Sequence, residues 1–129
     1  MKEMIRKNIF SVAIALIIMY LSLASSDSFD RVSFFDFPGF DKVVHSCMYF
    51  ALMSVIILEH KIVNYRLSKL FLVSLIPLIY GSLMEVGQSI FTVSRSASFL
   101  DILANLAGIL VSVFSFTLYK RRNTSSVKK

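Results

Sequence analysis

The sequence has a single cysteine and few charged side chains for its length. Cys47 is the only cysteine in 129 residues, so the chain cannot form an intramolecular disulfide or a multi-cysteine metal site. Charged residues make up 17% of the chain, against about a quarter in soluble domains. An ordinary soluble domain is therefore a poor match. Because Cys47 lies within an apolar run, we interpret it as a small buried hydrophobic residue.

The chain is rich in apolar residues, which lie in four long segments. Hydrophobic residues make up 56% of the chain, and its mean hydropathy is +0.71. Four apolar segments cover residues 8–24, 43–63, 70–91 and 99–119, each near the ~20 residues that span a ~30 Å hydrocarbon core. The alternation of β-barrel strands is absent, and in hydrocarbon a helix satisfies its own backbone amides. We therefore predict an all-α integral membrane protein, a single four-helix domain over residues 1–129.

The first apolar segment has two interpretations. Basic residues followed by an apolar run, with Ser22 and Ala24 before a potential cleavage point, also describe a secretory signal. The apolar run is long for the core of a signal, and cleavage would leave three membrane spans rather than a secreted domain. Retention as a helix is favoured, and cleavage stays open.

Lysine and arginine are distributed unevenly between the two sides of such a bundle. Three precede the first segment, three lie from the end of the second segment to the start of the third, and five follow the fourth, whereas the other two connections contain only Arg31, Lys42 and Arg95. By the positive-inside rule, both termini are then cytoplasmic. The net charge of +6 does not indicate nucleic-acid binding, because the basic residues do not follow one face.

The connection at residues 25–42 combines four aspartates with five phenylalanines around a Pro-Gly pair. In the predicted orientation it lies on the outer side. Because aromatic side chains favour the membrane interface, we expect this connection to lie on the interface or to fold over the helix ends.

Three of the predicted helices carry polar residues at similar depth near the outer side. Within each helix these residues are three or four positions apart, so they share one helical face. Ionisable groups are costly in a membrane unless they are paired or used, which makes the cluster a candidate binding site. The predicted ligand-binding residues are Asp41, Lys42, His45, Tyr49, Glu85, Gln88, Arg95, Asp101 and Asn105.

The sign of the ligand's charge stays open. The second and fourth helices would point their N-termini outward, and Arg95 offers a planar donor fork, both of which favour phosphate or carboxylate. The three carboxylates of the cluster would repel an anion unless they pair with Arg95 and Lys42 or hold a cation. We assign no cofactor and no metal, because without a second histidine or cysteine near His45 a zinc site would need three carboxylates.

Small residues predict close contacts between the helices. Ala104, Gly108 and Ser112 are four apart on the last segment, and Gly81 and Gly87 lie on the third. Lipid gives helices no hydrophobic drive to associate, so small residues that let backbones approach become important for packing.

Three motifs in order along the chain resemble the VanZ-like family of small bacterial membrane proteins. They are Asp41-Lys42 with His45 and Tyr49, then Glu85 with Gln88, then Arg95 with Asp101, Asn105 and Gly108. Ser46 and Ser112 depart from the pattern, since an aromatic residue and a second glycine are usual there. The resemblance covers residues 41–112 and implies a multi-span protein of the bacterial cell membrane. One family member is associated with resistance to the antibiotic teicoplanin. The family has no established biochemical mechanism, so the resemblance implies a class of protein and not a reaction.

Three functions fit these residues. The favoured one is an outward-facing pocket that binds a lipid head group, a lipid-linked cell-wall precursor or a glycopeptide antibiotic. The second is a membrane-embedded hydrolase of lipid phosphates or esters, with His45, Glu85 and Asp101 as catalytic candidates. The third is a structural role, in which the polar residues lock the helices together and the protein assists a partner. No oligomeric state is predicted.

Overall fold

The computed structural model describes residues 7–23, 39–61, 66–91 and 98–126, with side chains up to residue 123. Four helices account for nearly all of them, and the described residues contain no strand. The helices are α2 (Ile9–Leu23), α3 (Phe40–Glu59), α4 (Leu67–Phe91) and α5 (Phe99–Ser126). The all-α prediction is confirmed for this part of the chain. The aromatic connection falls mostly at residues 24–38, outside the described residues.

The second helix begins and ends earlier than the predicted range of 43–63. Gly39 adopts a left-handed backbone conformation with φ of 93°, and its carbonyl accepts the amides of Lys42 and Val43 at 3.1 and 3.3 Å. A glycine tolerates this conformation without steric cost, so the helix starts directly after it. At the other end the helix stops at Glu59, and Lys61 has a φ of 51°. Turn chemistry, rather than the length of the apolar run, sets both ends.

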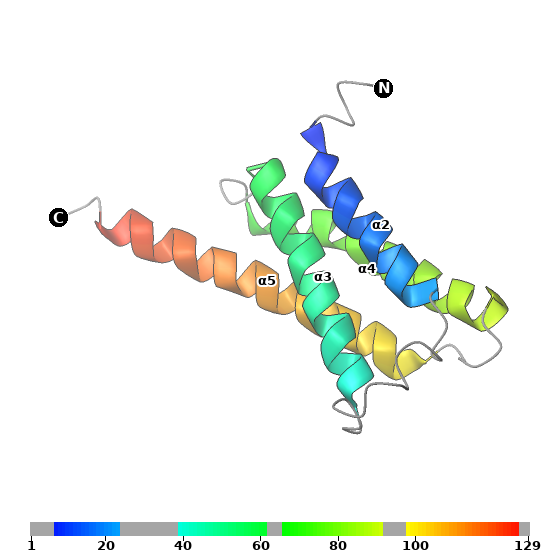
Figure 1. Cartoon of the computed structure of the whole chain (residues 1–129). Coiled ribbons are helices and arrows are strands. Elements are labelled where there is room, and N and C mark those ends of the chain that lie inside the picture. Colours follow the sequence, from blue (N-terminus) through cyan, green and yellow to red (C-terminus); the bar gives the residue numbers. More distant parts are fainter. Residues whose placement is uncertain (1–6, 24–38, 62–65, 92–97, 127–129) are drawn as a thin grey trace.

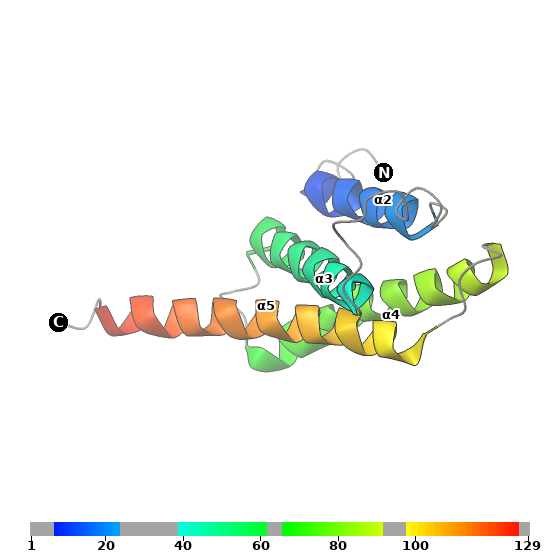
Figure 2. The same ribbon diagram turned by 60° about the horizontal axis from the view of Figure 1, so that its bottom comes forward.

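α3 and α5 form the most extensive helix interface among the described residues. α3 crosses the N-terminal half of α5 (Figure 1). α2 packs against α3 and α4, and Figure 2 shows α3 lying between α2 and α5. The N-terminal ends of α3 and α5 and the C-terminal end of α4 lie on the same side of the molecule. The fold therefore brings together the helix ends that carry the predicted polar residues.

The predicted small-residue contact lies at the crossing of α3 and α5. A Cβ atom on Gly108 would overlap the carbonyl oxygen of Ser46 and would lie 3.0 Å from the amide nitrogen of Phe50. Farther along, the hydroxyl oxygens of Ser54 and Ser112 are 2.8 Å apart and share a hydrogen bond. The two backbones therefore touch directly, as small residues on a membrane helix allow.

A carboxylate from α3 caps the start of α2. Glu59 accepts hydrogen bonds from the backbone amides of Phe10 and Ser11, at 2.8 and 3.2 Å, and from the Ser11 hydroxyl. These amides belong to the first turn of α2, where helical partners are missing and the helix dipole is positive. Glu59 therefore stabilises α2 from a position 48 residues away.

Side chains of α4 bind the backbone of α2 at two further points. The Tyr80 hydroxyl donates to the carbonyl oxygen of Ala15 at 2.6 Å, and the Gln88 amide donates to that of Ser22 at 2.9 Å. Together with the Glu59 cap, these bonds fasten α2 near its start, middle and end.

The surface and the core are inverted relative to a soluble protein. Large apolar side chains are exposed on the outer helix faces, among them Leu72 at 67% and Ile90 at 69%, while seven polar or charged residues of the described segments are buried. Soluble proteins seldom expose continuous apolar faces or bury unpaired charge. α3, α4 and residues Phe99–Asn123 of α5 are long and apolar enough to cross a membrane, and α2 is a shorter apolar helix of 15 residues. These features indicate a membrane protein.

The interpretation of Cys47 as a buried residue is wrong. Its side chain is exposed, on the same face of α3 as Val43 and Phe50. α3 turns the opposite face, with His45 and Tyr49, into the structure. A segment that is apolar on all sides does not reveal which face is packed, so the sequence pattern was not sufficient here.

Candidate functional site

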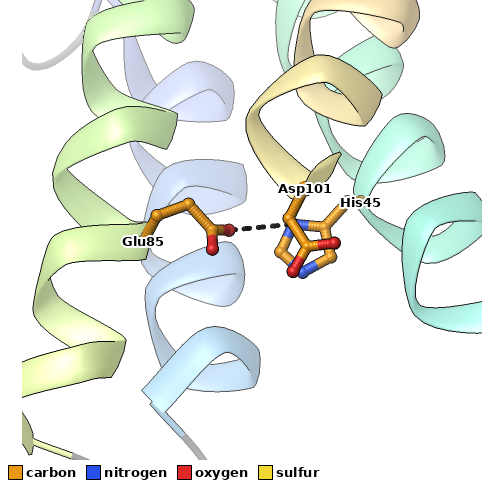
Figure 3. A group of neighbouring side chains, drawn as sticks. All are labelled: His45, Glu85 and Asp101. Atoms are coloured by element: carbon orange, nitrogen blue, oxygen red, sulfur yellow. Dashed lines mark ion pairs between the residues drawn. The ribbon is translucent and has the colours of Figure 1, made fainter. Parts of the chain in front are cut away.

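Three ionisable residues from three helices meet inside the structure. His45 comes from the N-terminal half of α3, Glu85 from the C-terminal half of α4 and Asp101 from the first turn of α5. They are 5%, 1% and 9% exposed, and Figure 3 shows the Glu85 carboxylate pointing toward the His45 ring, which Asp101 overlaps in this view. We call His45, Glu85 and Asp101 the buried triad. The predicted convergence of these three residues is present in the structure.

The imidazole of His45 is the centre of the contacts. Its Nδ1 atom lies 3.1 Å from Oδ1 of Asn105 and 3.4 Å from Oε1 of Glu85. The tautomer of the ring decides whether Nδ1 donates to these oxygens or offers a lone pair to a ligand. One potential metal-ligand atom from each triad residue lies within 4.8 Å of those of the other two. The carboxylates and the imidazole are therefore close enough to act on one small ligand or ion.

Asp41 and Lys42 form a half-exposed rim above the triad. Lys42 Nζ lies 3.0 Å from Oδ2 of Asp41 and 3.7 Å from Oδ1 of Asp101. The Lys42 and Asp41 side chains are 37% and 43% exposed, whereas that of Asp101 is 12% exposed. The site therefore runs from an accessible ion pair down to fully buried Glu85. Of the two alternatives for the carboxylates, pairing or holding a cation, the structure shows Lys42 paired with Asp41 and Asp101.

Tyr49, Asn105 and Gly81 lie together next to the triad. A Cβ atom on Gly81 would be 2.9 Å from Nδ2 of Asn105 and 3.0 Å from two ring carbons of Tyr49. The Tyr49 hydroxyl and the Asn105 Nδ2 are buried and have no hydrogen-bond partner among the described residues. Sequence reasoning treated Gly81 only as a packing residue. Its position four residues before Glu85, on the same helical face, was the signal that links it to the site.

Two other predicted site residues lie elsewhere or outside the described structure. Gln88 is 2% exposed, and its amide donates to the Ser22 carbonyl of α2, so it also fastens α2 to α4. Arg95 belongs to residues 92–97, which lie outside the described residues. His45 pairs with Glu85, and Asp101 pairs with Lys42.

Comparisons with protein-family models, curated proteins and solved structures found no match for this chain. The class of this protein therefore rests on its own sequence and structure. The described residues form an all-helical membrane protein with a buried site of one imidazole and two carboxylates. The likeness to the VanZ-like family stays a prediction from three sequence motifs.

Proposed function

We propose that the chain is a multi-pass protein of the bacterial cell membrane with a VanZ-like architecture. In this proposal all four helices cross the membrane, both termini are cytoplasmic, and the rim faces outward. The exposed apolar faces and three sufficiently long helices support membrane insertion. The excess of Lys and Arg at the opposite helix ends supports the orientation.

The hydrogen bonds of α2 support its retention as the first span. A cleaved signal would leave the Glu59 carboxylate without the amides of the α2 first turn, and would remove the carbonyls that Tyr80 and Gln88 bind. Polar groups left unpaired in an apolar environment cost about 1–3 kcal/mol each. These contacts of α2 with α3 and α4 therefore support its retention.

We infer that the rim and the buried triad bind the phosphate-bearing head group of a membrane lipid or lipid-linked cell-wall precursor. The observation that carries this proposal is the graded site, in which half-exposed Lys42 and Asp41 lead to buried Asp101 and Glu85. A lipid that lies beside the bundle presents its head group at this end while its chains contact the apolar helix faces. Lys42 then offers the head group a cation at the entrance to the site.

Unsatisfied polar atoms favour binding over a purely structural role. Residues that only lock helices together are expected to satisfy one another, because a buried unpaired donor is costly. The Tyr49 hydroxyl and Asn105 Nδ2 lack hydrogen-bond partners among the described residues, although both side chains are 1% exposed. These groups are available to a ligand or to a water molecule that accompanies it.

A membrane-embedded hydrolase is the second candidate. It is favoured by the imidazole of His45 lying 3.4 Å from the Glu85 carboxylate, within reach of Asp101. Such a set can orient a base and stabilise charge on a reacting phosphate or ester. Release of phosphate from a lipid phosphomonoester by the purified protein, lost in His45→Gln, would establish this function in place of simple binding.

The binding proposal is tested with purified full-length protein in mild detergent and a fluorescent short-chain phosphatidic acid. We expect saturable binding that Lys42→Gln weakens about tenfold, because Lys42 is the cation at the entrance, and that Asp101→Asn does not weaken, because it removes a negative charge. Ser89→Ala is the matched control, since Ser89 is exposed near the same end of α4 and its hydroxyl donates to the Val86 carbonyl of its own helix. Equal affinities in all four proteins would refute the proposal. Saturable binding of teicoplanin but not of the lipid would replace the lipid with a glycopeptide.

A further inference from the structure

The ligand atoms of the buried triad have a spacing that suits a metal ion. In a tetrahedral zinc site with bonds of about 2.0–2.2 Å, neighbouring ligand atoms are about 3.3–3.6 Å apart. His45 Nδ1 and Glu85 Oε1 are already 3.4 Å apart, and all three ligand atoms lie within 4.8 Å of one another. Closing the set around one ion therefore requires side-chain shifts of roughly 1 Å.

A neighbouring amide gives a second, independent indication of a ligand. Asn105 is 1% exposed, and its Oδ1 atom lies 3.1 Å from the His45 ring. The Nδ2 atom of the same amide has no hydrogen-bond partner among the described residues, and neither does the neighbouring Tyr49 hydroxyl. An oxygen atom bound to a metal at the triad, from water or phosphate, would give these two groups a partner.

We propose that His45, Glu85 and Asp101 bind one divalent transition-metal ion, for which Zn²⁺ is the best match. Imidazole with carboxylate oxygens suits Zn²⁺, whereas Ca²⁺ takes six to eight oxygen ligands and Mg²⁺ keeps several waters. Three protein ligands leave one position open for a water molecule or a phosphate oxygen. The ion would place a positive charge beside the two carboxylates, where it would attract an anionic head group. This last step rests on the proposed function, whereas metal binding itself does not.

Zinc binding is measured first, without lipid. The full-length protein in mild detergent is stripped of metal with a chelator, titrated with Zn²⁺ by calorimetry and checked for metal content after dialysis. We expect about one Zn²⁺ per chain, and an affinity at least about tenfold lower in His45→Gln. His60→Gln is the matched control, because His60 is the other histidine of the chain and lies past the opposite end of α3.

A spectroscopic measurement separates coordination from nonspecific binding. Co²⁺ in a four-coordinate site absorbs strongly in the visible range, so the wild type and His60→Gln should show these bands and His45→Gln should not. Asp101→Asn, which keeps the shape of the side chain, should weaken the bands even if His45→Gln fails to fold. Wild-type protein without stoichiometric Zn²⁺ would overturn the proposal. Equal Zn²⁺ affinity in the wild type, His45→Gln and Asp101→Asn would also overturn it.

Lipid binding with and without chelator then distinguishes this inference from the proposed function. Phosphatidic acid binding that requires Zn²⁺ supports both. Stoichiometric Zn²⁺ without lipid binding supports the metal site and refutes the head-group function. Lipid binding that is unchanged by the chelator supports head-group recognition and overturns the role of the ion in it.

Discussion

Replacing Gly108 with alanine tests the α3–α5 contact that holds the site together. The new Cβ atom would overlap the Ser46 carbonyl oxygen and would lie 2.9 Å from the carbon of that carbonyl, against 3.4 Å for ordinary contact. These are backbone atoms of α3, which cannot rotate away. The two helices must therefore separate by at least half an ångström, and by more to clear the oxygen. The His45–Asn105 contact of 3.1 Å, which joins the same two helices, would lengthen with them.

The expected cost is at the upper end of what overpacking produces, about 3 kcal/mol. Two other glycines calibrate this value. A Cβ on Gly87 meets only Leu23, at 3.9 Å, so Gly87→Ala should be neutral or stabilising by up to about 1 kcal/mol. A Cβ on Gly81 meets side-chain atoms of Asn105 and Tyr49 at 2.9 and 3.0 Å. These atoms can shift by a few tenths of an ångström, so Gly81→Ala should cost about 1 kcal/mol.

Unfolding by SDS in mixed micelles gives the measurement. The chain has no tryptophan and five tyrosines, so near-ultraviolet circular dichroism reports tyrosine packing, to which buried Tyr49 contributes. The free energy of unfolding should decrease in the order Gly87→Ala, Gly81→Ala, Gly108→Ala, with about 3–4 kcal/mol between the first and the last. If Gly108→Ala is as stable as Gly87→Ala, the close approach of α3 and α5 is wrong, and with it the geometry of the buried triad.

Three further predictions follow from other contacts. Glu59→Gln removes the charge that caps the first turn of α2, so α2 amides should exchange hydrogen faster, with a loss of about 1 kcal/mol; unchanged exchange would contradict the cap. Ser112→Ala removes the hydrogen bond to Ser54 and should cost about 1 kcal/mol in the same SDS titration, whereas exposed Ser115→Ala should cost nothing measurable. Epitope tags at both termini should be protected from protease in intact cells and digested in inverted vesicles, and digestion of either tag in intact cells would refute the proposed orientation.

Local sequence properties were sufficient to predict the helices and the polar faces. The helical spacing of Asp41, His45 and Tyr49, and of Asp101 and Asn105, is a property of each segment alone. The structure confirms the all-α fold, and it brings His45 together with Asn105 from another helix. Segment ends were less predictable, because Gly39 and the turn after Glu59 set them independently of the apolar runs.

The tertiary structure decided which groups meet. Glu59 caps a helix that begins 50 residues earlier, and no local pattern links it to α2. The sequence gives one indication of this role of Glu59. A carboxylate at the C-terminal end of a helix is repelled by the negative end of the helix dipole, so a partner from another element is expected.

The composition and spacing of the residues therefore determined that the chain forms apolar helices with polar residues near one end. They did not determine that Cys47 faces outward, that His45 pairs with Glu85, or that Asp101 pairs with Lys42. Helices that are apolar on all sides can pack through several faces with similar hydrophobic gain. Shape at the contact, above all the missing side chain of Gly108 against Ser46, selects the face and thereby positions the buried triad.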